Sequence, residues 1–529
     1  MNETELLILG LLIAIPALSV LAGLVRVPYP IALVLGALAI AFIPGVPDVE
    51  LDPELVLVIF LPPLLYVAAF NTDLRELRAN ARAIGLTSIG LVLATTCAVA
   101  IVAHALIDGL PWAAAFALGA IVSPTDPVAA TAIVRRLGAP RRLVAVIEGE
   151  SLVNDAAALI AYRVAVVAAI GGAFSLLDAT AEFFIAVAVG LAVGMLVGAV
   201  IAEIRRRLED VPVEITISLF TGYAAYLPAE ALHGSGVIAA VTAGIYLGWL
   251  SPRISSANMR MQGFAVWEFA TFLINAVLFV LIGMQLPEIL DAVSGTPAAT
   301  LIGYAAATIA VVVGARFAWM FTIPYLFRLL DRRPSQVERR VGPGQRVVVA
   351  WSGMRGAVTL AAALALPLET DGGAPFPERE LLIFLAYCVV VFTVVVQGLT
   401  LPSVIRRLDV RDDGSDEVAE EHAARIASAE AALDRLEALT DEEWTYEDTV
   451  DRARRLFDFR RRRFATMSGE HEDEEGIVDR SHAYQRLMQE LIDAQREAIV
   501  RLRNERQISN EVMRRIERDL DLEESRLEI

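Results

Sequence analysis

The sequence lacks lysine altogether and has very little cysteine. All 45 basic residues among the 529 are arginine, which excludes chemistry that needs a lysine amine. The two cysteines lie in separate apolar runs, which argues against a disulfide framework or a cysteine-rich metal site. The sequence shows no phosphate-binding glycine loop, zinc-ligand spacing or nucleophile elbow. We therefore expect no cofactor and no enzymatic activity.

Long apolar runs dominate the first three quarters of the chain. The sequence is 56% hydrophobic with a mean hydropathy of +0.56, which is too apolar for a soluble protein of this length. Thirteen stretches approach the roughly 20 residues that cross a bilayer core, the second being short. This predicts an all-α, polytopic protein in the cell (inner or plasma) membrane. The predicted spans are centred near Ala17, Gly36, Phe60, Leu93, Pro124, Asp155, Gly190, Phe220, Val241, Leu278, Val313, Gly356 and Val391.

Negative charge gathers at the C-terminal end. From Ser403 onwards there are 34 acidic residues and 22 arginines, so this part carries −12 of the formal net charge of −18 and argues against nucleic acid as a partner. We predict a transmembrane domain over 1–402, a charged linker over 403–420 and an amphipathic helical tail over 421–529. Helical patterns cover Glu417–Leu439, Glu442–Arg463 and Ser481–Leu527.

Arginine is distributed unevenly among the loops between the predicted spans. Alternate loops hold nearly all of it, from Arg26 to the cluster between Arg328 and Arg346, whereas the opposite loops have almost none beyond Arg379. Short cytoplasmic loops concentrate basic residues. The pattern therefore predicts an N-terminus outside the cell and a cytoplasmic tail.

Two predicted spans are interrupted at mid-depth. Two prolines flank Asp126 in the fifth span, and two glycines flank Arg355 in the twelfth. The interruptions lie seven spans apart, as expected if spans one to six and eight to thirteen are inverted repeats. We expect two crossed broken helices with Asp126 and Arg355 as a charge pair that compensates the helix dipoles at the crossing. The alternative is two kinked helices joined by a buried ion pair.

The sixth span places several oxygen-bearing side chains near the centre of the membrane. Ser151 and Asp155 are one helical turn apart, as are Glu150 and Asn154. Together with unwound carbonyls near Thr125 they suit a hard monovalent cation. Burial favours the neutral form of a carboxyl group, so a proton and a cation would compete for Asp155. The alternative is a structural carboxylate bonded to the backbone.

Arg316 is a second mid-membrane cation, in the eleventh span. A bare Glu150 beside Asp155 would be costly, so we expect Glu150 and Arg316 to form a structural ion pair. Neither Asn154 nor Arg316 can exchange a proton in the cycle. The sequence therefore predicts exchange of one proton for one monovalent cation, without net charge movement.

In combination these residues resemble the signature of the monovalent cation/proton antiporter family and of its bacterial NhaP-like Na⁺/H⁺ exchangers. The resemblance covers about residues 5–402. Its motifs are Thr-Asp-Pro at 125–127, Gly-Glu-Ser-Leu-Val-Asn-Asp at 149–155, Ala-Arg at 315–316 and Gly-Met-Arg-Gly-Ala at 353–357.

The resemblance implies that Asp155 binds cation and proton in turn. It implies cation ligation by Ser151, Glu150 and the Thr125 main chain, with Asn154 shaping the site. It also implies a homodimer in the lipid bilayer that works by alternating access, with Na⁺ and H⁺ as substrates. Alternatives are Li⁺ or K⁺ in place of Na⁺, since the same oxygen ligands serve all three, and a cation channel, against which the lack of a repeated filter segment argues.

Overall fold

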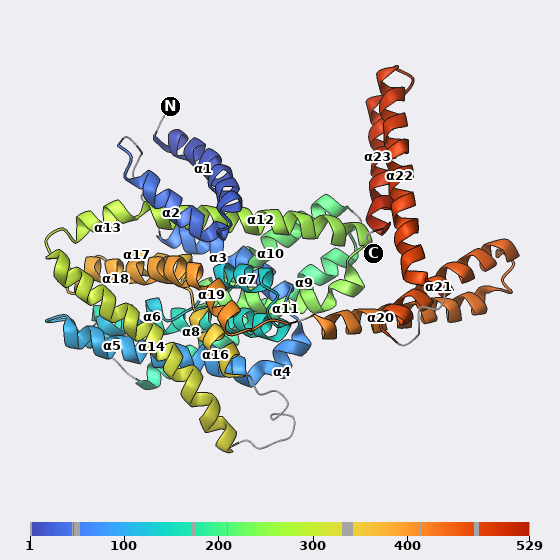
Figure 1. Cartoon of the computed structure of the whole chain (residues 1–529). Coiled ribbons are helices and arrows are strands. Elements are labelled where there is room, and N and C mark those ends of the chain that lie inside the picture. Colours follow the sequence, from blue (N-terminus) through green and yellow to red (C-terminus); the bar gives the residue numbers. More distant parts are fainter. Residues whose placement is uncertain are drawn as a thin grey trace. The chain divides into compact units, whose positions relative to one another are not determined.

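The structure is a computed structural model, and its described part is helical. Within that part the only β-type pairing is an isolated bridge between Glu369 and Pro375. The all-α prediction is therefore confirmed. The chain divides into two compact units, Met1–Asp412 and Asp413–Ile529 (Figure 1). The structure describes residues 3–44, 46, 53–171, 176–208, 210–330, 342–412, 414–469 and 476–527.

Every predicted span centre of the first unit falls within a helix or in the break of a helix pair. The helices up to the sixth span are α1 (Glu3–Val25), α2 (Tyr29–Ala41), α3 (Pro53–Phe70), α4 (Leu74–Gly85), the π-helix η1 (Leu86–Leu91), α5 (Val92–Leu106), α6 (Trp112–Val122), α7 (Pro127–Arg136) and α8 (Arg141–Gly171). Those that follow are α9 (Leu176–Arg206), α10 (Val211–Ala231), α11 (Gly236–Ile254), α12 (Ala257–Met284), α13 (Leu286–Ala292), α14 (Ala298–Leu330), α16 (Pro343–Trp351), α17 (Ala357–Leu364), α18 (Arg379–Val391), the π-helix η2 (Phe392–Gln397) and α19 (Gly398–Arg407).

Several of these helices have the length and apolar character of membrane spans. Among the described residues, 8 qualify by length and hydropathy, or up to 9 if one bent pair counts as a single span. The outer face of α9 exposes Phe184, Leu191, Leu196 and Val200, a surface suited to lipid rather than water. A polytopic membrane protein is confirmed. That all thirteen segments cross the bilayer stays a prediction.

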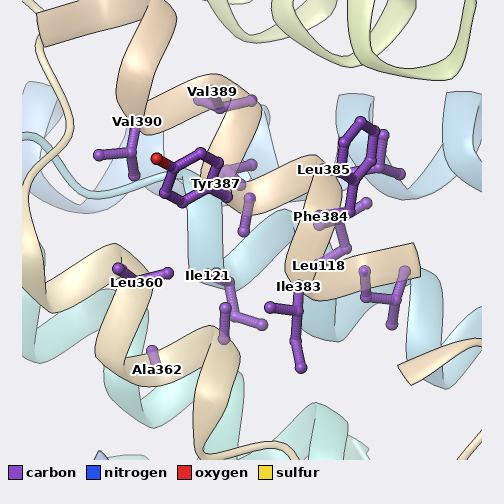
Figure 2. Packing of buried hydrophobic residues seen from close by; sticks show 14 of the residues in the cluster. Leu118, Ile121, Leu360, Ala362, Ile383, Phe384, Leu385, Tyr387, Val389 and Val390 are labelled. Carbon is purple, nitrogen blue, oxygen red and sulfur yellow. The ribbon is translucent and has the colours of Figure 1, made fainter. Parts of the chain in front are cut away.

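A large apolar core holds the halves of the broken spans in place. Figure 2 shows Leu118 and Ile121 of α6 and Leu360 of α17 packed with side chains of α18, among them Leu385 and Val390. Both are half-helices: α6 stops at the break in its span, and α17 starts at the break in its own. Because α18 packs against both, the same core fixes the position of both breaks.

In its described residues the second unit has four helices rather than the three expected. They are α20 (Ser415–Leu439), α21 (Glu447–Met467), α22 (Ile477–Asn504) and α23 (Asn510–Leu527). The predicted single helix over Ser481–Leu527 is wrong, because the chain turns at Arg506, which adopts a left-handed φ of 60°. The Ser509 hydroxyl then accepts a hydrogen bond from the Val512 amide at 3.2 Å and starts α23.

The turn lets the tail bury part of its own apolar stripe. Figure 1 shows α22 and α23 side by side, and Ile492, Ile499 and Leu520 form a small core between them. The Arg496 guanidinium pairs with Asp521 at 2.6 Å and also with Glu524. Its hydrogen bond to Glu524 lowers the pKa of that carboxyl group. The apolar pattern therefore finds a partner within the same chain.

Ending the chain after Asp412 should leave cation-driven proton movement measurable in vesicles. Every charge predicted at mid-membrane lies in the first unit, which is compact without the tail. The check is transport by the truncated protein after size-exclusion chromatography has shown it to be monodisperse. A monodisperse, inserted truncate that is inactive at every pH between 6 and 9 would contradict the prediction.

Candidate cation-binding site

The two interrupted spans touch where each loses its helical backbone. The segments 123–126 and 352–356 lie between α6 and α7 and between α16 and α17. The Asp126 amide donates a hydrogen bond of 2.8 Å to the Met354 carbonyl, which joins the two segments directly. Pro127 lacks an N–H and disfavours helical backbone at the preceding residue, so the first break follows from the sequence.

Glycine at 356 is what allows the segments to approach this closely. A Cβ atom at this position would overlap the carboxylate of Asp126. A Cβ at Gly353 would similarly meet the side chain of Arg316. Gly356 therefore permits the contact between the two segments, and Gly353 permits the close approach of the Arg316 side chain from α14.

Charged side chains cover the helix ends that the breaks create. The Asp126 carboxylate accepts a hydrogen bond of 2.9 Å from the Val128 amide at the N-terminus of α7. Arg355 Nε donates to the Val122 carbonyl at the end of α6, at 3.1 Å. Arg316 Nη2 donates to the Val349 carbonyl in the last turn of α16, also at 3.1 Å. Each charge therefore opposes the dipole of its helix end.

Asp126 and Arg355 do not form the ion pair that the sequence suggested. Neither side chain makes a salt bridge to the other in the described structure; besides Val122, Arg355 contacts the Gly353 carbonyl. The physical reason is that backbone groups freed inside a membrane have no water to bind. Asp126 and Arg355 therefore each form hydrogen bonds with backbone groups instead of pairing with each other.

Glu150 and Arg316 lie together as a buried, two-point ion pair. Arg316 Nη1 is 2.5 Å from Glu150 Oε1, and Nη2 is 3.2 Å from Oε2. Their side chains are only 2–3% exposed. The Thr125 hydroxyl donates a further hydrogen bond of 3.2 Å to Glu150. Both carboxylate oxygens are thus occupied, which favours a structural role for Glu150 over cation ligation.

A cavity of about 300 Å³ lies beside the crossing. Three acids line it: Asp126, Glu148 and Asp155. Asp126 accepts from the Val128 amide, and Glu148 pairs with Arg135 at 2.7 Å. Asp155 is buried, yet within the described ranges its carboxylate has no hydrogen bond and no ion pair. It is thus the one cavity acid left free to bind an ion.

Two neighbours of Asp155 on α8 hold the unwound segment at Thr125. The Ser151 hydroxyl donates to the Thr125 carbonyl at 2.9 Å, and Asn154 Nδ2 donates to the Thr125 hydroxyl at 2.8 Å. Ser151, Thr125 and Asp155 line the cavity, whereas Asn154 and Glu150 lie behind it. Three of the four predicted cation ligands therefore lie at the cavity, whereas Glu150 lies behind it together with Asn154, which was expected only to shape the site.

Several of the side chains that line the cavity carry oxygen atoms. A carboxylate, a hydroxyl and the oxygens of Thr125 face the same space. Such ligands suit hard cations. In the described part of the chain, no group of three or more His, Cys, Asp or Glu residues is placed to hold a metal ion. Asp155, Ser151 and Thr125 together therefore offer oxygen ligands for a cation.

Some polar groups of the fold were not assigned from the sequence. Arg163 pairs with Glu230, which also accepts a hydrogen bond of 2.9 Å from the Gly236 amide and so ties α8 to the α10–α11 turn. Asn275 and Thr271 of α12 line the cavity. The only sequence signal for Asn275 is a single amide within an apolar span.

Residues 8–407 match the sodium/hydrogen exchanger transmembrane family. The chain belongs to this family. It is 38% identical over 525 residues to an uncharacterised Na⁺/H⁺ exchanger of Mycobacterium tuberculosis, covering 98% of this chain and 95% of the relative. It is 34% identical over 389 residues to a sodium, potassium, lithium and rubidium/H⁺ antiporter of Bacillus subtilis, covering 71% of this chain and 57% of that one.

The fold is that of a solved exchanger as well. The sodium proton antiporter MjNhaP1 from Methanocaldococcus jannaschii superimposes with a TM-score of 0.57 at 17% sequence identity, covering 77% of this chain and 99% of that one. The expected resemblance to the cation/proton antiporters is thus confirmed. As a family of transporters, the exchangers move ions rather than transform substrates.

Replacing Arg316 by alanine should lower the melting temperature in detergent sharply, because Glu150 would remain as a buried, unpaired charge. Breaking such a pair costs ~3–5 kcal/mol. Arg163→Ala is the matched control, since the side chains of its pair with Glu230 are 43% and 26% exposed and such pairs contribute about 0–1 kcal/mol. Equal melting temperatures for Arg316→Ala and the parent would refute the structural role.

Proposed function

We propose that this exchanger moves one Na⁺ against one H⁺ across the cell membrane, with Asp155 as the site that both ions share. The observation that supports this most is the free Asp155 carboxylate at the cavity, beside Ser151 and the carbonyl of Thr125. A buried carboxylate without a partner is costly while it is ionised. It is therefore stabilised either by a proton or by a cation, and the two exclude each other.

Relatives support Na⁺ as the first cation to test. The relatives from Mycobacterium and Synechocystis are named as Na⁺/H⁺ exchangers or antiporters, while the Bacillus relative is named for sodium, potassium, lithium and rubidium. A K⁺/H⁺ exchange is thus the second candidate. The oxygen ligands at Asp155 would serve either ion.

The charges at the crossing favour an electroneutral exchange. Asp126, Glu150 and Asp155 carry three negative charges when ionised, and Arg316 and Arg355 carry two positive ones. The resulting net charge of −1 is balanced by one proton or one monovalent cation. A second transported proton would need another carboxyl group without a partner, but Glu150 is paired with Arg316 and Asp126 accepts a hydrogen bond from the Val128 amide.

The shape of the cavity supports alternating access. The cavity extends to the pair of Arg135 and Glu148, whose side chains are 64% and 37% exposed, so it opens at that end. Arg135 lies in the last turn of α7, in one of the arginine-rich regions that we place in the cytoplasm. The structure would then correspond to an inward-facing state. In this proposal the exchanger is a homodimer, with its N-terminus outside the cell and its tail in the cytoplasm.

The direct test is dissipation of a pH gradient in proteoliposomes by added Na⁺, Li⁺ or K⁺. We expect Na⁺ to collapse the gradient, with Li⁺ at comparable rates and K⁺ weaker. Choline chloride at the same ionic strength controls for leak. If none of the three cations moves protons beyond the choline rate, the proposed function is wrong.

The variant Asp155→Asn should insert normally and lose exchange by at least a hundredfold, because an amide neither releases a proton nor carries the charge that binds the cation. Asp291→Asn, the same substitution at an exposed position of α13, is the matched control. The measurement is Na⁺-driven proton movement at equal protein density. Near-normal exchange by Asp155→Asn would remove the central residue from the proposal.

A membrane potential should leave the exchange equilibrium unmoved, because the net charge transferred per cycle is zero. Vesicles holding fixed Na⁺ and pH gradients can be clamped at different potentials with K⁺ and valinomycin. The balance point, at which no net proton movement occurs, is then compared between potentials. A shift of that point with potential would favour two protons per cation.

A further inference from the structure

One buried amide lines the cavity from a helix that contributes none of the residues assigned so far. The cavity receives Thr271, Asn275 and Leu278 from α12, at the spacing of successive helical turns. Asn275 is only 3% exposed. Its side chain makes no hydrogen bond to any residue in the described part of the chain.

A buried amide in this position needs a partner. Nearly all buried polar groups in proteins are hydrogen-bonded, and one that is not carries a specific explanation such as a bound ion or water. The cavity is the space that Asn275 shares with Asp155, Ser151 and Thr125. An ion or water that occupies this cavity is therefore the available partner of the Asn275 amide.

We propose that the amide oxygen of Asn275 is a further ligand of the transported cation, added from α12 to the oxygens of Ser151, Asp155 and Thr125. The inference rests on the proposed function and names one more residue of its binding site. A small monovalent cation entering the cavity loses water ligands, and each must be replaced by a protein oxygen or a retained water. The three oxygen donors near the crossing come from α8 and the 123–126 segment, and Asn275 supplies a donor from a different helix.

The chemistry of an amide suits this role. A carboxamide oxygen binds a cation without titrating, so it raises cation affinity and adds no proton to the cycle. An acid at this position would add a second charge and a second titrating group to the site. Asn275 therefore strengthens cation binding while the exchange stays one for one.

The proposal predicts a change in affinity rather than in turnover. In proteoliposomes of the full-length chain, Asn275→Ala should raise the KM for Na⁺ about tenfold, the loss expected for one contact of hydrogen-bond strength, with the maximal rate kept within about twofold. Asn275→Asp keeps an oxygen in the same place and should return the KM to within about threefold of the parent. Gln262→Ala removes an exposed amide from the same helix and serves as the matched control, with an unchanged KM.

For variants that reconstitute poorly into vesicles, Na⁺ binding can be measured in detergent instead. Na⁺ binding stabilises the folded protein, so the melting temperature in detergent should rise with Na⁺ concentration, and the midpoint of that rise should move about tenfold higher in Asn275→Ala. Choline at matched ionic strength is the reference.

The outcomes distinguish the role of Asn275 from the proposed exchange function. A parent protein without cation-driven proton movement contradicts the proposed function itself. A parent that exchanges, together with an Asn275→Ala variant whose KM and melting midpoint are unchanged, overturns the role of Asn275 alone. A lower maximal rate at unchanged KM, or an Asn275→Asp variant as weak as Asn275→Ala, also overturns it, since a packing defect would produce either result.

Discussion

A helix that stops inside a membrane leaves backbone groups that no water reaches, and the arrangement at the crossing follows from that constraint. The breaks at 123–126 and 352–356 satisfy it in two ways. The Asp126 amide bonds to the Met354 carbonyl across the crossing, and the side chains of Asp126, Arg316 and Arg355 bond to the helix ends. Because these charged side chains are hydrogen-bonded to the backbone, they and the two unwound segments form a fixed framework beside the cavity.

Glu150 and Asp155 lie on the same helix, α8, but have different surroundings. Glu150 points to Arg316 and Thr125, which occupy both of its oxygens, whereas Asp155 lies a little more than one turn further along α8 and faces the cavity. The charge of a paired carboxylate is compensated by its partner, whereas a buried carboxylate without a partner is costly while it is ionised. This difference in surroundings, rather than in residue type, is the reason we propose Asp155 as the exchanging group.

Much of this could be read from the sequence because the signals are local. Prolines beside Asp126 and glycines beside Arg355 mark the breaks, hydropathy marks the spans, and helical spacing groups Ser151 with Asp155. The direction of the Arg355 side chain could not be predicted, since it depends on how two distant segments cross. Asn275 has no periodic signal, and only the packing of α12 brings it to the cavity. The turn at Arg506 was hidden because the apolar pattern continues through it.

Competition between one proton and one cation for the Asp155 carboxylate is the proposal on which the exchange mechanism depends. Its most direct test is the KM for Na⁺ in proteoliposomes, measured with equal pH on both sides across a range from acidic to alkaline. We expect the KM to level off at high pH and, at low pH, to rise towards tenfold for each unit of acidification. A KM that does not change with pH, or one that rises towards a hundredfold per unit, would contradict it.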